Sequence, residues 1–154
     1  MEKIYGGNER QDALIKVGKS YYLYYGFGRD SEEAEHGYNY RHKFDHKPTP
    51  DEIKEQVLAA IDMHASERIT RGLTYNGYKV NLTIENQTNY TMFKSMGRYP
   101  VLIKVEDAEG NDVVLSLTKE EFSSFITSMQ NHIKECLQES WNEKANLDLS
   151  VYAQ

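Results

Sequence analysis

The sequence from residue 118 to residue 145 is TKEEFSSFITSMQNHIKECLQESWNEKA. Thr118, followed three residues later by Glu121, forms a capping-box pattern, which predicts that a helix begins here. Mostly apolar side chains then recur at spacings of three and four residues, which predicts a buried stripe. The members of this stripe are Phe122, Phe125, Ile126, Met129, Ile133, Cys136, Leu137 and Ser140. The pattern therefore predicts one amphipathic helix over residues 119–145, about 40 Å long at 1.5 Å per residue.

A second capping box precedes another amphipathic helix. Thr49 and Glu52 stand at the capping positions, and Pro50 suits the first helical turn. Apolar residues at helical spacing then favour a helix over residues 50–71. A shorter helical stretch is expected over residues 83–96.

Three pairs of strands complete the expected fold. Asn76-Gly77 supplies the two positive-φ positions of a tight turn, so residues 73–82 form the clearest hairpin. The remaining strands are expected at residues 13–17, 21–27, 99–106 and 113–117. The fold class is therefore α+β, with antiparallel β-hairpins packed against two amphipathic helices, of which the C-terminal one is long.

Charge and aromatic side chains are unevenly distributed along the chain. Residues 1–47 hold eight basic and eight acidic side chains, whereas residues 48–154 hold ten and sixteen. Eight of the 18 aromatic residues lie between Tyr21 and Phe44. These shifts predict an aromatic-rich N-terminal hairpin appendage over residues 1–47 and an α+β domain over residues 48–154. The appendage either extends the sheet of that domain or stands apart as a docking arm.

The composition argues against several classes of function. A net charge of −6 disfavours binding to a phosphate backbone, so we expect no nucleic-acid partner. A single cysteine excludes an internal disulfide framework and a cysteine-rich zinc ribbon. The first residues lack an apolar signal core, and no apolar run approaches the roughly 18 residues of a membrane span. The chain also lacks dinucleotide, P-loop and nucleophile-elbow motifs, so no cofactor is expected.

Three small groupings could carry chemistry, and a structural interpretation is preferred for each. His42, Asp45 and His46 are potential metal ligands, but three nearby cations oppose metal binding and favour a polar strand end. His64 begins half of an inverted zincin motif, whose second histidine is replaced by Arg68.

His132 and Cys136 lie one helical turn apart, as a thiolate–imidazole pair would. The cysteine belongs to the apolar stripe, which favours core packing and a raised pKa over an activated nucleophile. No catalytic residue and no metal site is therefore predicted.

The strongest candidates for binding are the N-terminal tyrosines. The six candidate contact residues are Tyr21, Tyr22, Tyr24, Tyr25, Tyr38 and Tyr40. Tyrosine offers a large contact area with few torsions to freeze, so contact with a protein partner or a second copy is favoured. A simple hairpin core and stacking on a sugar ring remain the alternatives.

Several stretches follow the pattern of a known family. They are RITRGLTYNG at 68–77, ENQ at 85–87, VLSLTKEEF at 114–122 and HIKECL at 132–137. Through them, residues 61–149 resemble a domain of unknown function found in phage and prophage tail-associated proteins. Residues 22–28 (YLYYGFG) and 37–48 (GYNYRHKFDHKP) are similar to N-terminal regions attached to this domain in prophages of the Bacteroides type.

The resemblance implies a phage tail gene cluster as the setting and supplies no catalytic set. We therefore expect a non-enzymatic tail or tail-fibre accessory protein, which acts as a virion component or assembly factor through contacts with other tail proteins or with itself. The expected location is the host cytoplasm during assembly, with the virion as a second location. A carbohydrate-binding module that uses the same tyrosines is the alternative function.

Overall fold

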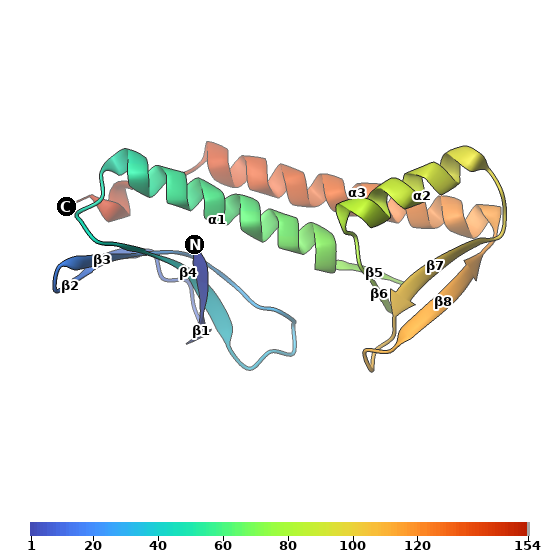
Figure 1. Ribbon diagram of the computed structural model, residues 1–154, viewed down its shortest axis with the longest axis horizontal. Helices are drawn as coiled ribbons and strands as arrows, with labels where there is room; N and C mark the ends of the chain where they lie inside the picture. Colours follow the sequence, from blue (N-terminus) through green and yellow to red (C-terminus); the bar gives the residue numbers. More distant parts are fainter. Residues whose placement is uncertain (154) are drawn as a thin grey trace. The chain divides into compact units, whose positions relative to one another are not determined.

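The strands of this protein form two separate four-stranded antiparallel sheets (Figure 1). The computed structural model describes residues 1–153. It divides into a first unit, Met1–Met63 with Glu143–Gln154, and a second unit, His64–Asn142. Within the described residues, no helix combines the length and the apolar composition needed to cross a membrane.

The sheet of the first unit has the strand order β1-β4-β3-β2. Its strands are β1 (Glu2–Gly7), β2 (Ala13–Val17), β3 (Ser20–Gly28) and β4 (Gly37–Phe44). One face of this sheet packs against the first half of helix α1 (Pro50–Arg71) and against the short 3₁₀ helix η1 (Ser150–Tyr152). The residues of the resulting core are Leu23, Tyr25, Tyr38, Tyr40, Phe44, Ile53, Val57, Ala60, Ile61 and Tyr152.

The sheet of the second unit has the order β5-β6-β7-β8. Its strands are β5 (Leu73–Tyr75), β6 (Tyr78–Val80), β7 (Val101–Glu106) and β8 (Asp112–Leu117). Helices α2 (Ile84–Met96) and α3 (Lys119–Ala145) supply the side chains that cover its inner face.

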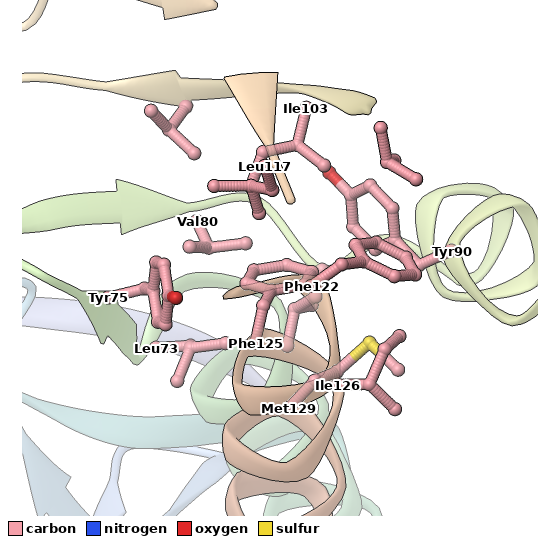
Figure 2. Close-up of a cluster of buried hydrophobic side chains, with 13 residues drawn as sticks. Leu73, Tyr75, Val80, Tyr90, Ile103, Leu117, Phe122, Phe125, Ile126 and Met129 are labelled. Carbon is pink, nitrogen blue, oxygen red and sulfur yellow. The ribbon is translucent and has the colours of Figure 1, made fainter. Parts of the chain in front are cut away.

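Aromatic rings form the centre of the second core (Figure 2). The ring of Phe125 meets those of Tyr75 and Tyr90 edge-on, with centroid separations of 5.2 and 5.1 Å. Phe122 stacks on Phe125 at 6.0 Å, and both phenylalanines are fully buried. Such edge-on pairs add to the hydrophobic gain from burial, so this cluster fixes α3 against β5 and α2.

Side-chain caps explain where the helices begin. The Thr49 hydroxyl accepts a hydrogen bond from the Glu52 amide at 3.2 Å, and the Glu52 carboxylate accepts one from the Thr49 amide at 3.1 Å. Thr118 and Glu121 form the same reciprocal pair at the start of α3, at 3.3 and 3.0 Å. Both capping boxes predicted from the sequence are thus confirmed.

Most elements of the expected α+β fold are confirmed. The helices expected over residues 50–71, 83–96 and 119–145 correspond to α1, α2 and α3. The Asn76-Gly77 turn has the expected positive φ angles, 50° and 83°. The hairpins at residues 73–82 and 99–117 join into one sheet.

The N-terminal region differs from the expectation. The strand pair at residues 13–17 and 21–27 does not extend the second sheet. It forms β2 and β3 of the first sheet, which β1 and β4 complete. Neither β1 nor the whole of β4 was expected, since Gly6 and Gly7 weaken the strand signal of the first and charged residues interrupt the second. The C-terminal tail contains η1, and Gln154 lies outside the described residues.

The domain boundary expected after residue 47 lies inside the first unit. That unit also takes in α1 up to Met63 and the segment from Glu143 onward. The division into an appendage over residues 1–47 and a domain over residues 48–154 stays a prediction.

A glycine at the start of β4 is required by its neighbours. A Cβ atom on Gly37 would lie 2.3 Å from a ring carbon of Phe27 and 2.6 Å from the Gly28 carbonyl oxygen. Gly37→Ala should therefore lower the free energy of unfolding by about 3 kcal/mol, since backbone as well as a side chain must move. Urea unfolding followed by circular dichroism measures this change.

Gly18→Ala provides the matched control. A Cβ on Gly18 would meet open space, so only its φ of 62° opposes alanine, at a cost of about 1 kcal/mol. Equal midpoints for the two variants would contradict the packing assigned to β4.

Candidate functional site

Strand alternation places the six candidate tyrosines on two opposite faces of the first sheet. Tyr25, Tyr38 and Tyr40 point to the covered face and are buried there, between 2% and 4% exposed. Tyr21 is half-buried against the same core. Tyr22 and Tyr24 have the opposite parity on β3 and therefore lie on the other face.

The cross-strand register defines what surrounds these two tyrosines. Tyr22 pairs with Ile15 of β2 and Lys43 of β4, and Tyr24 pairs with Arg41. We name this surface the tyrosine face, and it includes Glu2, Ile4, Ala13, Ile15, Val17, Tyr22, Tyr24, Asn39, Arg41 and Lys43. In the first unit, α1 and η1 contribute to the core of the opposite face (Figure 1). Of the tyrosine face, Val17 is 59% exposed and Ile15 is 38% exposed.

Arg41 is the fixed charge of the tyrosine face. Its guanidinium donates to the Glu2 carboxylate at 2.8 and 3.2 Å, and its central carbon lies 5.1 Å from the centroid of the Tyr22 ring. Hydrogen bonds to Glu2 and then to Tyr24 raise the pKa of Arg41 above its ordinary value. The result is an aromatic and aliphatic surface with a held cation, and one ring face of Tyr22 is occupied by that cation.

A second group of side chains ties the C-terminal segment to this sheet. The Tyr25 hydroxyl donates to the Glu143 carboxylate, and the Tyr152 hydroxyl donates to the Tyr24 carbonyl oxygen at 2.7 Å. Arg10 lies over the Tyr25 ring, 4.8 Å from its centroid.

The Tyr25 hydroxyl acts as a structural donor. Burial, and then the bond to Glu143, raise the pKa of Tyr25 well above its ordinary value. A phenol with so high a pKa stays protonated, which suits a permanent hydrogen bond and disfavours proton transfer near neutral pH. Sequence reasoning missed Glu143 and Tyr152, because no local spacing links residues more than 100 positions apart. It also missed Arg10, whose contact with the Tyr25 ring depends on the course of the chain between β1 and β3.

The histidines near the end of β4 do not converge on one point. Both nitrogens of His46 are engaged on opposite sides of its ring, with Asp45 and Glu52 oxygens each at 2.7 Å. His42 packs edge-on against Phe44, with a centroid distance of 4.7 Å. Across residues 1–153, no three His, Cys, Asp or Glu side chains gather in a way that could hold a metal ion. His46 therefore extends the capping box of α1 through Glu52.

His132 and Cys136 do come together, as their spacing allows. The ring Nε2 of His132 lies 2.8 Å from the Arg68 carbonyl oxygen in the last turn of α1, and 3.9 Å from the Cys136 sulfur. Cys136 is 1% exposed, and its burial raises the pKa of the thiol. A buried thiol with a raised pKa is a poor nucleophile, so the pair packs α3 against the end of α1. Arg68, which stands where the zincin motif has its second histidine, forms an ion pair with Glu139.

Comparison with known families connects this architecture to other proteins. A family model described as "Domain of unknown function (DUF4376)" matches residues 52–154. This chain belongs to the DUF4376 family. No curated protein and no solved structure matches it. The sequence-based resemblance to a domain of unknown function is thus confirmed, and the association with phage tails stays a prediction.

The DUF4376 match covers all of the second unit but leaves out the tyrosine face. It begins in the first turn of α1, whereas Tyr22 and Tyr24 lie on β3. Inside the matched region, the polar residues after the Asn76-Gly77 turn support α2. Thr83 accepts from the Asn86 amide at 3.1 Å, and the Gln87 side chain donates to the Leu82 carbonyl oxygen at 2.9 Å. These polar side chains therefore hold the start of α2 against the end of the preceding segment.

The tie between Tyr25 and Glu143 can be measured directly. Tyr25→Phe removes one hydroxyl donor to a carboxylate and should lower the free energy of unfolding by about 1–2 kcal/mol. Tyr22→Phe, on the open face, is the matched control and should change stability by less than about 0.5 kcal/mol. In a double-mutant cycle, the losses in unfolding free energy caused by Tyr25→Phe and Glu143→Gln should be coupled. Additive losses would contradict the hydrogen bond between Tyr25 and Glu143.

The pKa values of His42 and His46, near the end of β4, should be shifted in opposite directions. Hydrogen bonds to Asp45 and Glu52 raise the pKa of His46 above its ordinary 6.5, whereas burial, and then the charge of the N-terminal amine, lower that of His42. Stability linked to His46 is therefore lost as the pH rises through its raised pKa. Stability linked to His42 is lost as the pH falls below its ordinary range.

NMR titration of the imidazole protons checks both directions. Glu52→Gln should shift the pKa of His46 toward its ordinary value and leave that of His42 unchanged. The geometry assigned to His46 would be wrong if its pKa were insensitive to this substitution.

Proposed function

We propose that this DUF4376 chain is a non-enzymatic accessory protein of a phage or prophage tail or tail fibre, and that it acts through protein–protein contacts. It would serve as a virion component or as an assembly factor. The observation that carries the proposal is the tyrosine face, where Tyr22 and Tyr24 lie on the sheet face opposite the helix-covered core.

The chemistry of the tyrosine face suits a protein partner. Tyrosine and arginine are among the residues most enriched at positions that dominate binding energies, and Arg41 lies against Tyr22. The exposed Ile15 and Val17 add apolar area beside them. Lys43, which is exposed on this face, favours a partner that presents a carboxylate, whereas Arg41 is already paired with Glu2.

The proposal of a phage setting rests on the resemblance of the sequence patterns. The stretches at residues 68–77, 114–122 and 132–137 follow the pattern of a domain associated with phage tails. The same stretches form the β5–β6 turn, the start of α3 and the contact between α3 and α1.

A non-enzymatic role is supported by the way the reactive side chains are used. The Cys136 thiol is buried with a raised pKa, and Tyr25 is held as a donor to Glu143. His46 is held between two carboxylates near the start of α1. Each of these groups therefore has a structural partner that accounts for its position.

Carbohydrate binding makes a different demand on the same surface. Sugar rings stack on open aromatic faces, and the guanidinium of Arg41 covers one face of Tyr22. The geometry therefore favours a protein partner over a glycan.

The proposal is tested by replacing Tyr22 and Tyr24, the two half-buried tyrosines of the tyrosine face, in the phage. Tyr22→Ser with Tyr24→Ser should reduce the amount of this protein in purified tails at least about tenfold, or reduce the yield of intact tails to that extent. Immunoblotting and electron microscopy of the particles measure the two quantities. Circular dichroism verifies that the variant chain is folded.

Tyr5→Ser is the matched control, because Tyr5 is an exposed tyrosine of the same sheet that shares the face of its strand partner Tyr38. Tails that assemble normally and retain the double variant would contradict the proposal. Binding to a glycan array that requires Tyr22 and Tyr24, with normal tails, would support the carbohydrate-binding alternative instead.

A further inference from the structure

The strand β8 is an open edge of the second sheet. Within the described residues it pairs with β7 alone, over six consecutive residues from Asp112 to Leu117 (Figure 1). The backbone groups that point away from β7 therefore form a row of donors and acceptors suited to pairing with another strand.

The composition of β8 does nothing to prevent such pairing. Residues 113–117 are VVLSL, which contains no charge, no proline and no glycine. Val114 lies on the outer face of the sheet and is 64% exposed. Exposed edges usually carry a charge, a proline or a bulge that discourages association, so this strand is unusual.

The other sheet edges of the molecule carry such protection. β1 contains Glu2 and Lys3 and has a bulge between Tyr5 and Gly7. β2 contains Lys16 and lies beside η1. β5 is only three residues long. Among the four sheet edges in residues 1–153, β8 alone is long, regular and uncharged between its ends.

We propose that β8 pairs with β8 of a second copy of this chain, antiparallel about a two-fold axis. Identical strands related by a two-fold axis always meet antiparallel, so the edge is complementary to itself. The sheet β5-β6-β7-β8 of one copy and the same sheet of the other copy would then continue as one sheet of eight strands. The proposal concerns a surface of the second unit and does not depend on the tyrosine face.

The alternation of side chains restricts the register. Opposite residues of an antiparallel pair have their side chains on the same face of the sheet. The two-fold axis must therefore lie midway between one residue and its own copy, so that this residue is paired with itself. With the axis at Val114, this residue meets its own copy on the outer face, and Val113 meets Leu115 on the inner face. Asp112 then faces Ser116, so no like charges are opposed.

Sedimentation of the full chain over a range of concentrations tests the proposal. The native chain should dimerise, and Val114→Glu should raise the dissociation constant of the dimer at least about tenfold, because two carboxylates would face each other. The monomer should tolerate this change, since Lys104 is the cross-strand neighbour of Val114 on β7.

Leu102→Glu is the matched control. Leu102 is 61% exposed on the same outer face but belongs to β7, one strand away from the edge. Its substitution should leave the dissociation constant within about twofold of the native value. A native chain that stays monomeric throughout its soluble range, or equal effects of the two variants, would overturn the proposal.

A cysteine variant tests the register without altering the charge. Val114→Cys should form an intermolecular disulfide on mild oxidation, because the two Cβ atoms would lie within disulfide reach. Leu102→Cys should not, and the native chain gives the background from the buried Cys136. Equal cross-linking at the two positions would place the contact elsewhere and contradict the proposal.

Discussion

The burial of one face of each sheet is the constraint on which the rest of this molecule depends. An antiparallel sheet of four strands needs a hydrophobic cover on one side to be stable, and it can leave the other side in water. In the first unit α1 supplies that cover through residues such as Val57, and in the second unit α3 supplies it through Phe122 and Phe125. The remaining faces and edges are then available for partners. This is why the tyrosine face and the β8 edge are the surfaces from which function is inferred.

Much of the fold could be predicted because its signals are local. The starts of α1 and α3 follow from the capping pairs Thr49–Glu52 and Thr118–Glu121, each of which needs only four residues. The β5–β6 turn follows from Asn76-Gly77. By contrast, β1 gains its place by pairing with β4, whose residues lie 30 to 39 positions further along the chain, and no short pattern encodes that partnership. The separate sheet of the first unit was missed for this reason.

The candidate site could be predicted only in part. The cluster of tyrosines is visible in the sequence, but their division between core and surface depends on which face α1 covers. Once that face is known, alternation along β3 assigns Tyr25 to the core and Tyr22 to the surface. The bond from Tyr25 to Glu143 joins residues 118 positions apart, so it could not be found from spacing. In the sequence, Arg41 is only one of the three cations near His42, Asp45 and His46, and its contact with the Tyr22 ring becomes visible only in the folded sheet.

The inferred contact surface depends on the division of the tyrosines between the two faces of the first sheet, and nitration with tetranitromethane tests this division most directly. Peptide mass spectrometry would give the rate of modification at each ring in the native chain. We expect fast nitration of Tyr22 and Tyr24 and slow nitration of Tyr25, Tyr38 and Tyr40, which are buried. Modification of Tyr40 as fast as that of Tyr22 would contradict the arrangement of the sheet and remove the basis for the proposed contact surface.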